Sequence, residues 1–331
     1  MRCFVTGGTG FIGLHLVRRL VSEGHEVRCL VRKHSRIQPL QALGVDLVVG
    51  DVNDRAALRE GLQGCDWLFH LANLYSMWEP DRRSFHRVNV EGTRNVLETA
   101  LEAGVKKAIY ISTVAVYGKP AEVPFREDSQ HGPRLFSEYA RSKALADAVA
   151  WDLARRGLPL VVFYPGIVLG AGDDKASGRY IQDILRRRVP STIFHDSVST
   201  YVHVDDVVDA LLRAAEKPGV EGQKYLLGKY HLNGRGFANL VHEVSGVPLP
   251  LIHLPDFIVL AAAYLLTGIS TVIRRAPLWG LSIDAAWTLK HGFQCDGSKA
   301  ERELGITYSP VRKAMAEAVS SYRQRWASRR R

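Results

Sequence analysis

Short apolar runs and amphipathic stretches alternate along the chain up to about residue 165. Apolar runs of strand length lie at residues 3–5, 26–32, 45–49, 67–73, 108–113 and 160–166. After the first run, Leu14, Leu16, Val17 and Leu20 follow in a helical pattern. Strands that alternate with helices are typical of a parallel sheet covered by helices on both faces. The pattern therefore predicts an α/β fold, a Rossmann-type doubly wound parallel sheet.

The alternation loosens after the sixth predicted strand. Residues 174–200 and 217–331 mix short strands with helices and are expected to form a smaller mixed α/β lobe that binds substrate. Residues 1–173 are expected to form the nucleotide-binding domain, and residues 201–216, rich in valine and leucine, to return to it. A ligand site is then expected in the cleft between the lobes, beyond the carboxyl ends of the strands.

One run in the second half, residues 257–266, is wholly apolar. At ten residues it is too short to cross a bilayer, which takes about 20 residues, so no transmembrane segment is predicted. We interpret it as a buried or substrate-facing helix. A weak contact with a membrane surface is the alternative, because apolar residues continue to Ile273 and are followed by Arg274 and Arg275.

A glycine-rich turn joins the first predicted strand to the first helix. Gly7 permits a tight turn, Gly10 leaves space where a pyrophosphate would approach the backbone, and Gly13 allows the helix to pack closely on the sheet. The free N–H groups and the positive dipole end of the helix then face the phosphates. The predicted phosphate loop comprises Gly7, Thr9, Gly10, Phe11, Ile12 and Gly13.

The second predicted strand stops at Arg32, about 20 residues beyond the glycines, where such folds bind the adenosine ribose. An acidic residue there would accept a hydrogen bond from a 2′-hydroxyl. Arg32, with Lys33 and Arg36 nearby, instead suits a 2′-phosphate. We therefore favour NADP(H), with NAD(H) possible, and a solvated basic loop as the alternative.

Other residues at the ends of strands are expected to contact the cofactor. Asp51 follows the third strand and is placed either to cap the next helix or to meet the adenine edge. Ala72 would let the central part of the cofactor pass close to the backbone. The remaining expected contacts are Val52, Leu71, Asn73, Ser112, Tyr164, Pro165, Gly166 and Ile167.

Tyr139 and Lys143 lie four residues apart in a predicted helix, on one face. A cation beside a phenol would lower the tyrosine pKa from about 10 toward working pH, and such a tyrosine can exchange a proton with a carbonyl or alcohol. An exposed helix face is the alternative. The strand that ends in Ser112 and Thr113, upstream of Tyr139, favours the chemical interpretation.

Motifs in family order make the chain resemble an extended short-chain dehydrogenase/reductase. They are residues 6–13, Gly50-Asp51, 70–72, 88–93, 112–118, 139–143 and 201–207. The resemblance implies a catalytic Tyr139, a Lys143 that binds the nicotinamide ribose and tunes the tyrosine, and a Thr113 that orients the substrate oxygen, with Ser112 as neighbouring candidate. It also implies that Asn89 helps hold the active-site helix and a proton-relay water.

Departures from family patterns narrow the reaction. Dehydratases carry an Asp-Glu pair where this chain has Val114 and Ala115, so an acid for dehydration is missing. Nucleotide-sugar epimerases place an asparagine and an arginine on the substrate diphosphate, where this chain has Tyr164 and Ser199. The chain instead resembles the dihydroflavonol reductase branch. The hypothesis is an NADPH-dependent carbonyl reductase or alcohol dehydrogenase for an apolar substrate; a sugar or nucleotide-sugar epimerase and a non-catalytic dinucleotide-binding protein are the alternatives.

Composition limits the other function classes. The net charge of +10 comes without a helix-turn-helix, zinc or RNA-binding signature, so nucleic acid is not a predicted partner. The four cysteines are scattered, which predicts small buried residues in a reducing compartment and no metal site. No signal peptide is recognised, and a cytoplasmic location is expected. The family resemblance implies a homodimer through helices near residues 82–103 and 135–156.

Overall fold

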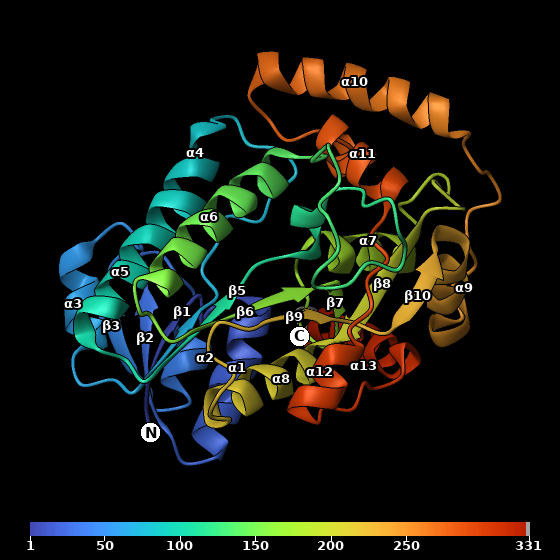
Figure 1. Ribbon diagram of the computed structural model, residues 1–331. Helices are drawn as coiled ribbons and strands as arrows, with labels where there is room; N and C mark the ends of the chain where they lie inside the picture. Colours follow the sequence, from blue (N-terminus) through green and yellow to red (C-terminus); the bar gives the residue numbers. More distant parts are fainter. Residues whose placement is uncertain (329–331) are drawn as a thin grey trace.

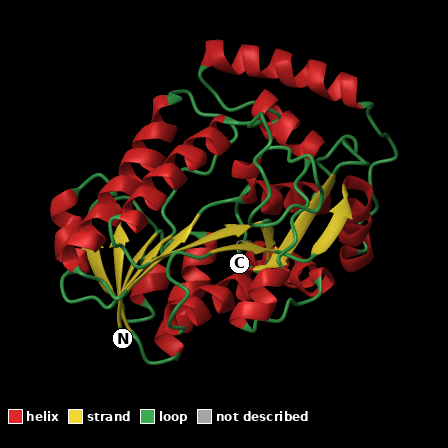
Figure 2. Cartoon of the chain, in the orientation of Figure 1, coloured by secondary structure: helices red, strands yellow, loops and turns green. Residues whose placement is uncertain are grey.

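The main body of the computed structural model, which describes residues 1–328, is a seven-stranded parallel sheet between two layers of helices (Figures 1 and 2). The strand order is β3-β2-β1-β4-β5-β6-β9. The order in which the chain adds strands reverses between the parallel neighbours β1 and β4, and this switch point creates the crevice in which such folds bind ligands. The strands are β1 (Arg2–Thr6), β2 (Glu26–Val31), β3 (Asp46–Val49), β4 (Trp67–His70), β5 (Lys107–Ile111), β6 (Leu160–Pro165) and β9 (Lys224–Leu227). The predicted doubly wound fold is confirmed.

Each face of this sheet is covered by amphipathic helices that bury their apolar side. One face packs against α3 (Arg55–Leu62), α5 (Gly92–Ala103) and α6 (Glu138–Arg155). The other packs against α1 (Phe11–Ser22) and α8 (Val204–Glu216). The short elements on this domain are α2 (Gln38–Gln41), α4 (Arg83–Phe85), η1 (His86–Glu91) and η2 (Val114–Tyr117).

The smaller lobe is built around a three-stranded sheet of order β10-β8-β7. Its strands are β7 (Ile167–Leu169), β8 (Val198–His203) and β10 (Tyr230–Asn233). Its helices are α7 (Ala176–Leu185), α9 (Gly234–Ser245), α10 (Asp256–Ile273), η3 (Leu278–Gly280), α11 (Ile283–His291) and α13 (Val311–Ser328).

The predicted boundary at residue 217 differs from the structure. Strand β9 pairs in parallel with β6 and completes the main sheet, and α12 (Ser298–Leu304) packs against β9 and α8. The physical reason is that Tyr225, Leu226 and Leu227 are fully buried and their backbone continues the hydrogen-bonded ladder of β6. Helix α8 does return to the main domain as expected, whereas β7 and β8 belong to the small sheet.

Strand β4 ends at His70, three residues earlier than predicted. The amide of Ala72 donates to Thr6 Oγ1 at 3.3 Å, and the amide of Leu74 donates to Asn89 Oδ1 at 2.7 Å. These amides bond to side chains instead of a neighbouring strand, so the ladder stops. The segment after His70 is therefore shaped by the residues around the glycine turn and η1.

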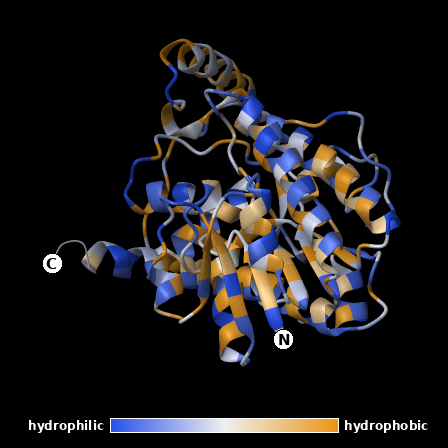
Figure 3. Cartoon of the chain, turned by 90° about the vertical axis from the view of Figure 1, so that its left-hand side faces the viewer, coloured by the Kyte–Doolittle hydropathy of each residue, from blue (hydrophilic) through white to orange (hydrophobic). Residues whose placement is uncertain are grey.

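Helix α10 contradicts the expectation of a short buried helix. It has 18 residues with a mean hydropathy of 1.9, which is long and apolar enough to cross a membrane, yet only 17% of it is buried. Figure 1 shows it along the outer edge of the small lobe, and Figure 3 shows its orange to pale, hydrophobic shades at the top of the view. Only Val259, Ala263 and Ser270 are buried, because the helix contacts the protein along one narrow stripe facing α11.

We predict that Gly13→Ala destabilises the protein by about 1–3 kcal/mol, because a Cβ on Gly13 would overlap the Gly7 carbonyl oxygen. The matched control is Gly268→Ala, where a Cβ meets no atom within 4 Å. Because position 268 lies inside a helix, alanine there should stabilise the protein by up to about 1 kcal/mol. Urea unfolding midpoints measure both changes, and equal midpoints for Gly13→Ala and wild type would contradict close packing at the glycine turn.

Candidate active site

The glycine turn between β1 and α1 leaves a cradle beside the polypeptide backbone. Gly7 has a positive φ of 79°, and a Cβ there would lie 2.7 Å from the amide nitrogen of Ala72. Gly10 precedes α1, and no side chain caps the N-terminus of this helix. Free amides at a helix N-terminus next to a side-chain-free turn fit the pyrophosphate of a dinucleotide. The residues present therefore fit the cofactor implied by the motif.

Arg32 immediately follows β2 at the same edge of the sheet, and its side chain is exposed together with those of Lys33 and Arg36. Within residues 1–328, none of these three cations forms an ion pair with a carboxylate. The geometry thus leaves three positive charges next to the ribose end of the predicted cofactor site. Binding measurements with NADPH and NADH distinguish a 2′-phosphate site from the solvated-loop alternative, which has the same geometry.

Asp51 does not cap a helix. The cap of α3 is Asp54, whose Oδ1 accepts from the amides of Ala56 and Ala57, both at 3.1 Å. Asp51 Oδ1 instead accepts from the Asn53 amide at 3.1 Å and forms a local turn. The capping alternative is therefore wrong, and contact with the adenine edge stays a prediction.

Tyr139 lies in the first turn of α6 and is buried, which excludes the alternative of an exposed helix face. Ser137 caps this helix by accepting from the Ala140 amide at 3.1 Å. The ring of Tyr75 stands edge-on to that of Tyr139, with centroids 5.0 Å apart. Burial raises the pKa of Tyr139 well above its ordinary value, and a hydrogen bond with Thr113 opposes that rise.

The hydrogen bonds of Lys143 within residues 1–328 go to strand β5 and not to the Tyr139 hydroxyl, and the pKa of Tyr139 is raised where the sequence predicts a lowered one. Its Nζ donates to the Tyr110 hydroxyl at 2.7 Å and to the Ile111 carbonyl at 2.8 Å. The lysine is buried, and burial lowers its pKa, while the negative charge of Asp147 raises it. Strand β5 thus supplies both acceptors to which the ammonium group donates.

Asp147 was missed by the sequence analysis, although it follows Lys143 by four residues on the same helix. Its Oδ1 accepts a hydrogen bond from Ser112 Oγ at 2.6 Å. Burial raises the pKa of Asp147, and the Lys143 ammonium opposes that rise. Ser112 is thus turned toward Asp147, whereas Thr113 lies at Tyr139.

The side chain of Tyr164 lies in the core between the sheet and α6. Its hydroxyl accepts from Trp151 Nε1 at 3.3 Å, and it also bonds Asp147. A cofactor contact through this side chain, as the sequence suggested, is not compatible with that burial. The following Gly166 lies so close to β8 that a Cβ would be 2.5 Å from the Thr200 carbonyl oxygen. Contacts to a cofactor from Tyr164 and Gly166 would therefore come from the backbone.

Asn89 holds two parts of the site together. It lies in η1, a π-helical segment, and irregular turns of this kind often occur at functional sites. Its Nδ2 donates to Ser142 Oγ of α6 at 2.9 Å and to the Leu74 carbonyl at 3.2 Å. Asn89 therefore joins α6 to the segment that follows β4. A water-binding role remains an expectation.

His70, at the end of β4, is a second residue that sequence analysis did not assign. Its ring nitrogens bond Thr6 Oγ1 at 2.7 Å and Thr93 Oγ1 at 3.0 Å. The ring stacks on Tyr110, the partner of Lys143, with centroids 5.5 Å apart. Burial, with a smaller contribution from Lys143, lowers the pKa of His70 to about 3. The imidazole is therefore neutral, and it packs against the face of the Tyr110 ring.

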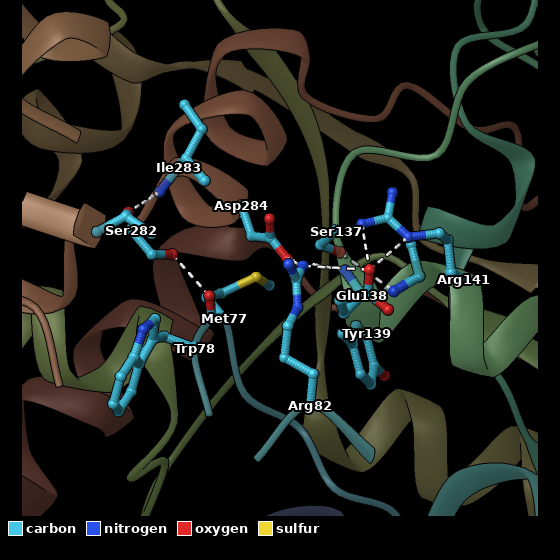
Figure 4. A network of polar contacts seen from close by, with 12 residues as sticks. Met77, Trp78, Arg82, Ser137, Glu138, Tyr139, Arg141, Ser282, Ile283 and Asp284 are labelled. Carbon is cyan, nitrogen blue, oxygen red and sulfur yellow. Dashed lines mark hydrogen bonds and ion pairs between the residues drawn. The ribbon is translucent and has the colours of Figure 1, made fainter. Parts of the chain in front are cut away.

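A polar network connects the small lobe to the start of α6 (Figure 4). Asp284 of α11 accepts from the Glu138 amide at 2.8 Å. Arg82 bridges the carboxylates of Glu138 and Asp284 at 3.1 and 3.8 Å. Ser282 donates to the Met77 carbonyl at 2.6 Å. Helix α11 thus fixes the helix turn that carries Tyr139, a connection for which the sequence offers no pattern.

Comparison with known proteins identifies similar chains that cover nearly the same length. Residues 3–228 match the model of the NAD dependent epimerase/dehydratase family. A protein of Synechocystis sp. named "Putative dihydroflavonol 4-reductase" is 35% identical over 96% of this chain and 93% of its own. A 4-hydroxy-2-methyl-3-oxo-4-farnesyl-3,4-dihydroquinoline-1-oxide ketoreductase of Stigmatella aurantiaca is 33% identical over 92% of this chain and 91% of its own.

Solved structures confirm the fold. The crystal structure of gox2253 superposes with a TM-score of 0.83 at 32% identity and covers 98% of both chains. The UDP-glucose 4-epimerase of Bifidobacterium longum, in complex with NAD+ and UDP, superposes with a TM-score of 0.76 at 22% identity and covers 98% of both chains. At that identity the second likeness shows the fold alone.

The neutral, buried His70 predicts a pH-dependent stability. Its folded pKa lies below the unfolded value of 6.5, so its contribution is complete above pH 6.5 and is lost as pH falls toward 3. Between pH 7 and pH 5, wild type should lose about 2 kcal/mol more unfolding free energy than His70→Gln, which cannot titrate. Urea unfolding at both pH values measures this difference, and parallel losses would contradict it.

Proposed function

Since the chain belongs to the NAD-dependent epimerase/dehydratase family and is an NAD(P)-dependent oxidoreductase of the extended short-chain type, we propose that it is an NADPH-dependent carbonyl reductase for an apolar ketone. The same site would oxidise the alcohol in reverse. Three observations support the proposal. Tyr139 is buried and protonated, the chain lacks the asparagine and arginine that would bind a nucleotide-sugar diphosphate, and relatives that it resembles are named reductases.

The observation that carries the proposal is a buried Tyr139 with Thr113 beside it. A tyrosine phenol is protonated at neutral pH, and burial of Tyr139 raises its pKa further, so this hydroxyl has a proton to give to a carbonyl that accepts hydride. Thr113 would hold the same substrate oxygen. Lys143 and Asp147 follow Tyr139 on the same helix, and their opposite charges oppose the pKa shifts that burial produces in each other.

The glycine cradle and the exposed Arg32 would hold the cofactor, which supplies hydride when bound. Gly7 and Gly10 leave room for the pyrophosphate, and the amides of α1 would bond it. Arg32 would bind the 2′-phosphate. Tyr139 would give its proton to the carbonyl oxygen, so that the ketone, with one hydride at carbon and one proton at oxygen, becomes the alcohol.

The epimerase alternative rests on the fold that this chain shares with NAD-bound epimerases. It is disfavoured because Tyr164 is packed in the core and Ser199 lies in β8, where the resemblance places an amide and a cation for a diphosphate. By contrast, the name of the ketoreductase from Stigmatella aurantiaca describes a substrate that contains an apolar farnesyl group. A screen of ketones with NADPH decides between them: net NADPH oxidation supports reduction, and isomerisation without net cofactor change supports epimerisation.

Tyr139→Phe should lower the turnover of a ketone that the wild type reduces by about 100-fold or more, because the proton donor is lost while ring packing is kept. Affinity for NADPH, measured by calorimetry, should stay within a factor of about two. Tyr75→Phe is the matched control and should lose far less. Turnover near that of wild type in Tyr139→Phe would remove Tyr139 from the mechanism.

Arg32→Ala should weaken NADPH binding by about 1.5–3 kcal/mol and leave NADH binding nearly unchanged, because only NADPH offers a charged partner. Added salt should reduce the preference of wild type for NADPH. Arg59→Ala removes an exposed cation on α3 and serves as the charge-matched control. If calorimetry finds equal affinity of wild type for both cofactors, the NADP(H) assignment is wrong.

A further inference from the structure

The outer side of α10 is an apolar surface that no other described part of the chain covers. We define the α10 face as Phe257, Ala261, Tyr264, Leu265, Gly268 and Val272, which recur every three or four residues and are all exposed. Leu265 is 66% exposed and Val272 is 83% exposed. Exposed Leu251 and Ile252 before the helix and Trp279 after it extend the apolar surface. Such a continuous surface marks an interaction site.

The attachments of α10 make it lie along the protein surface. Val259 and Ala263 pack inward, and Thr267 Oγ1 accepts from the Ile283 amide of α11 at 2.8 Å. The chain before α10 is tied down by the bridge between Thr192 and His253. Both ends of the helix thus return to the same lobe, which suits a helix lying in a membrane interface and not one crossing it.

Charge at the two ends favours a lipid surface over a second protein copy. Residues 257–273 contain no Asp, Glu, Lys or Arg, and exposed Arg274 and Arg275 follow directly. Asp256, at the other end, lies 3.7 Å from Lys290. A protein interface usually has a polar rim, whereas an apolar face with adjacent arginines and an aromatic side chain such as Trp279 matches anionic headgroups above acyl chains.

We propose that α10 docks this protein on the surface of a bilayer containing anionic phospholipid, and that its substrate is an apolar ketone dissolved in that bilayer. The second half rests on the proposed reductase function. Helix α10 packs on α11, and α11 caps the catalytic helix through Asp284 and Glu138. Docking through α10 would therefore bring the small lobe that borders Tyr139 close to the lipid, so that an apolar substrate need not cross water.

The test is cosedimentation of the full chain with vesicles of pure phosphatidylcholine or of equimolar phosphatidylcholine and phosphatidylglycerol. Wild type should prefer the anionic vesicles. Leu265→Glu/Val272→Glu should lower vesicle binding by about tenfold or more, because it places two charges on the α10 face, which would enter the lipid. Val49→Glu, at a site that is 65% exposed in β3, is the matched control and should bind as wild type does. Arg274→Asn/Arg275→Gln should lose the preference for anionic lipid.

Three outcomes would overturn the docking proposal. In the first, the wild type shows no vesicle binding, and in the second, the Glu variant binds vesicles as well as the wild type does. In the third outcome, light scattering shows a dimer for the wild type and a monomer for the Glu variant. Unfolding midpoints confirm that the variants fold. The reductase function is judged separately with NADPH and a water-soluble ketone, which the Glu variant should reduce at the wild-type rate while it reduces a vesicle-dissolved ketone more slowly. Vesicle binding without any reduction would reject only the reductase function.

Discussion

The exclusion of water from one face of α6 is the constraint on which the site depends. Tyr139, Lys143 and Asp147 follow one another at intervals of four residues and are all buried. Burying two opposite charges is costly, and the cost is offset only where each finds hydrogen-bond partners. Lys143 finds Tyr110 and the Ile111 carbonyl, and Asp147 finds Ser112. Strand β5 and the residue directly after it therefore supply hydrogen-bond partners to both charges.

This requirement extends beyond α6 through neutral polar groups. The Tyr110 hydroxyl meets the ammonium, His70 stacks on the Tyr110 ring, and Thr6 and Thr93 satisfy both nitrogens of His70. A charged His70 imidazole would place a second cation near Lys143, and this repulsion is one reason why the pKa of His70 is lowered. The first, fourth and fifth strands of the chain are thereby joined into one network behind the site. Its members are buried, which rigidifies the site.

Sequence reasoning identified candidate site residues where local rules of structure indicate them. Gly7 and Gly13 were identifiable because the turn leaves no room for a Cβ, and Tyr139 and Lys143 because four residues make slightly more than one helical turn. Asp147 follows the same spacing and could have been found. His70 and Tyr75 could not, because their importance arises from neighbours distant in sequence. Likewise, the apolar composition of α10 could not reveal that its neighbours cover only one stripe.

The cap that α11 places on α6 has a consequence for how this architecture can diversify. Asp284 belongs to the lobe expected to select substrate, yet it accepts from the amide of Glu138, next to Tyr139. Exchange of the small lobe between relatives would therefore change more than the shape of the substrate cleft. A transplanted lobe without an equivalent acceptor would leave the first turn of α6 without that partner. In the proposed reductase, substrate choice and the position of the proton donor would thus be inherited together.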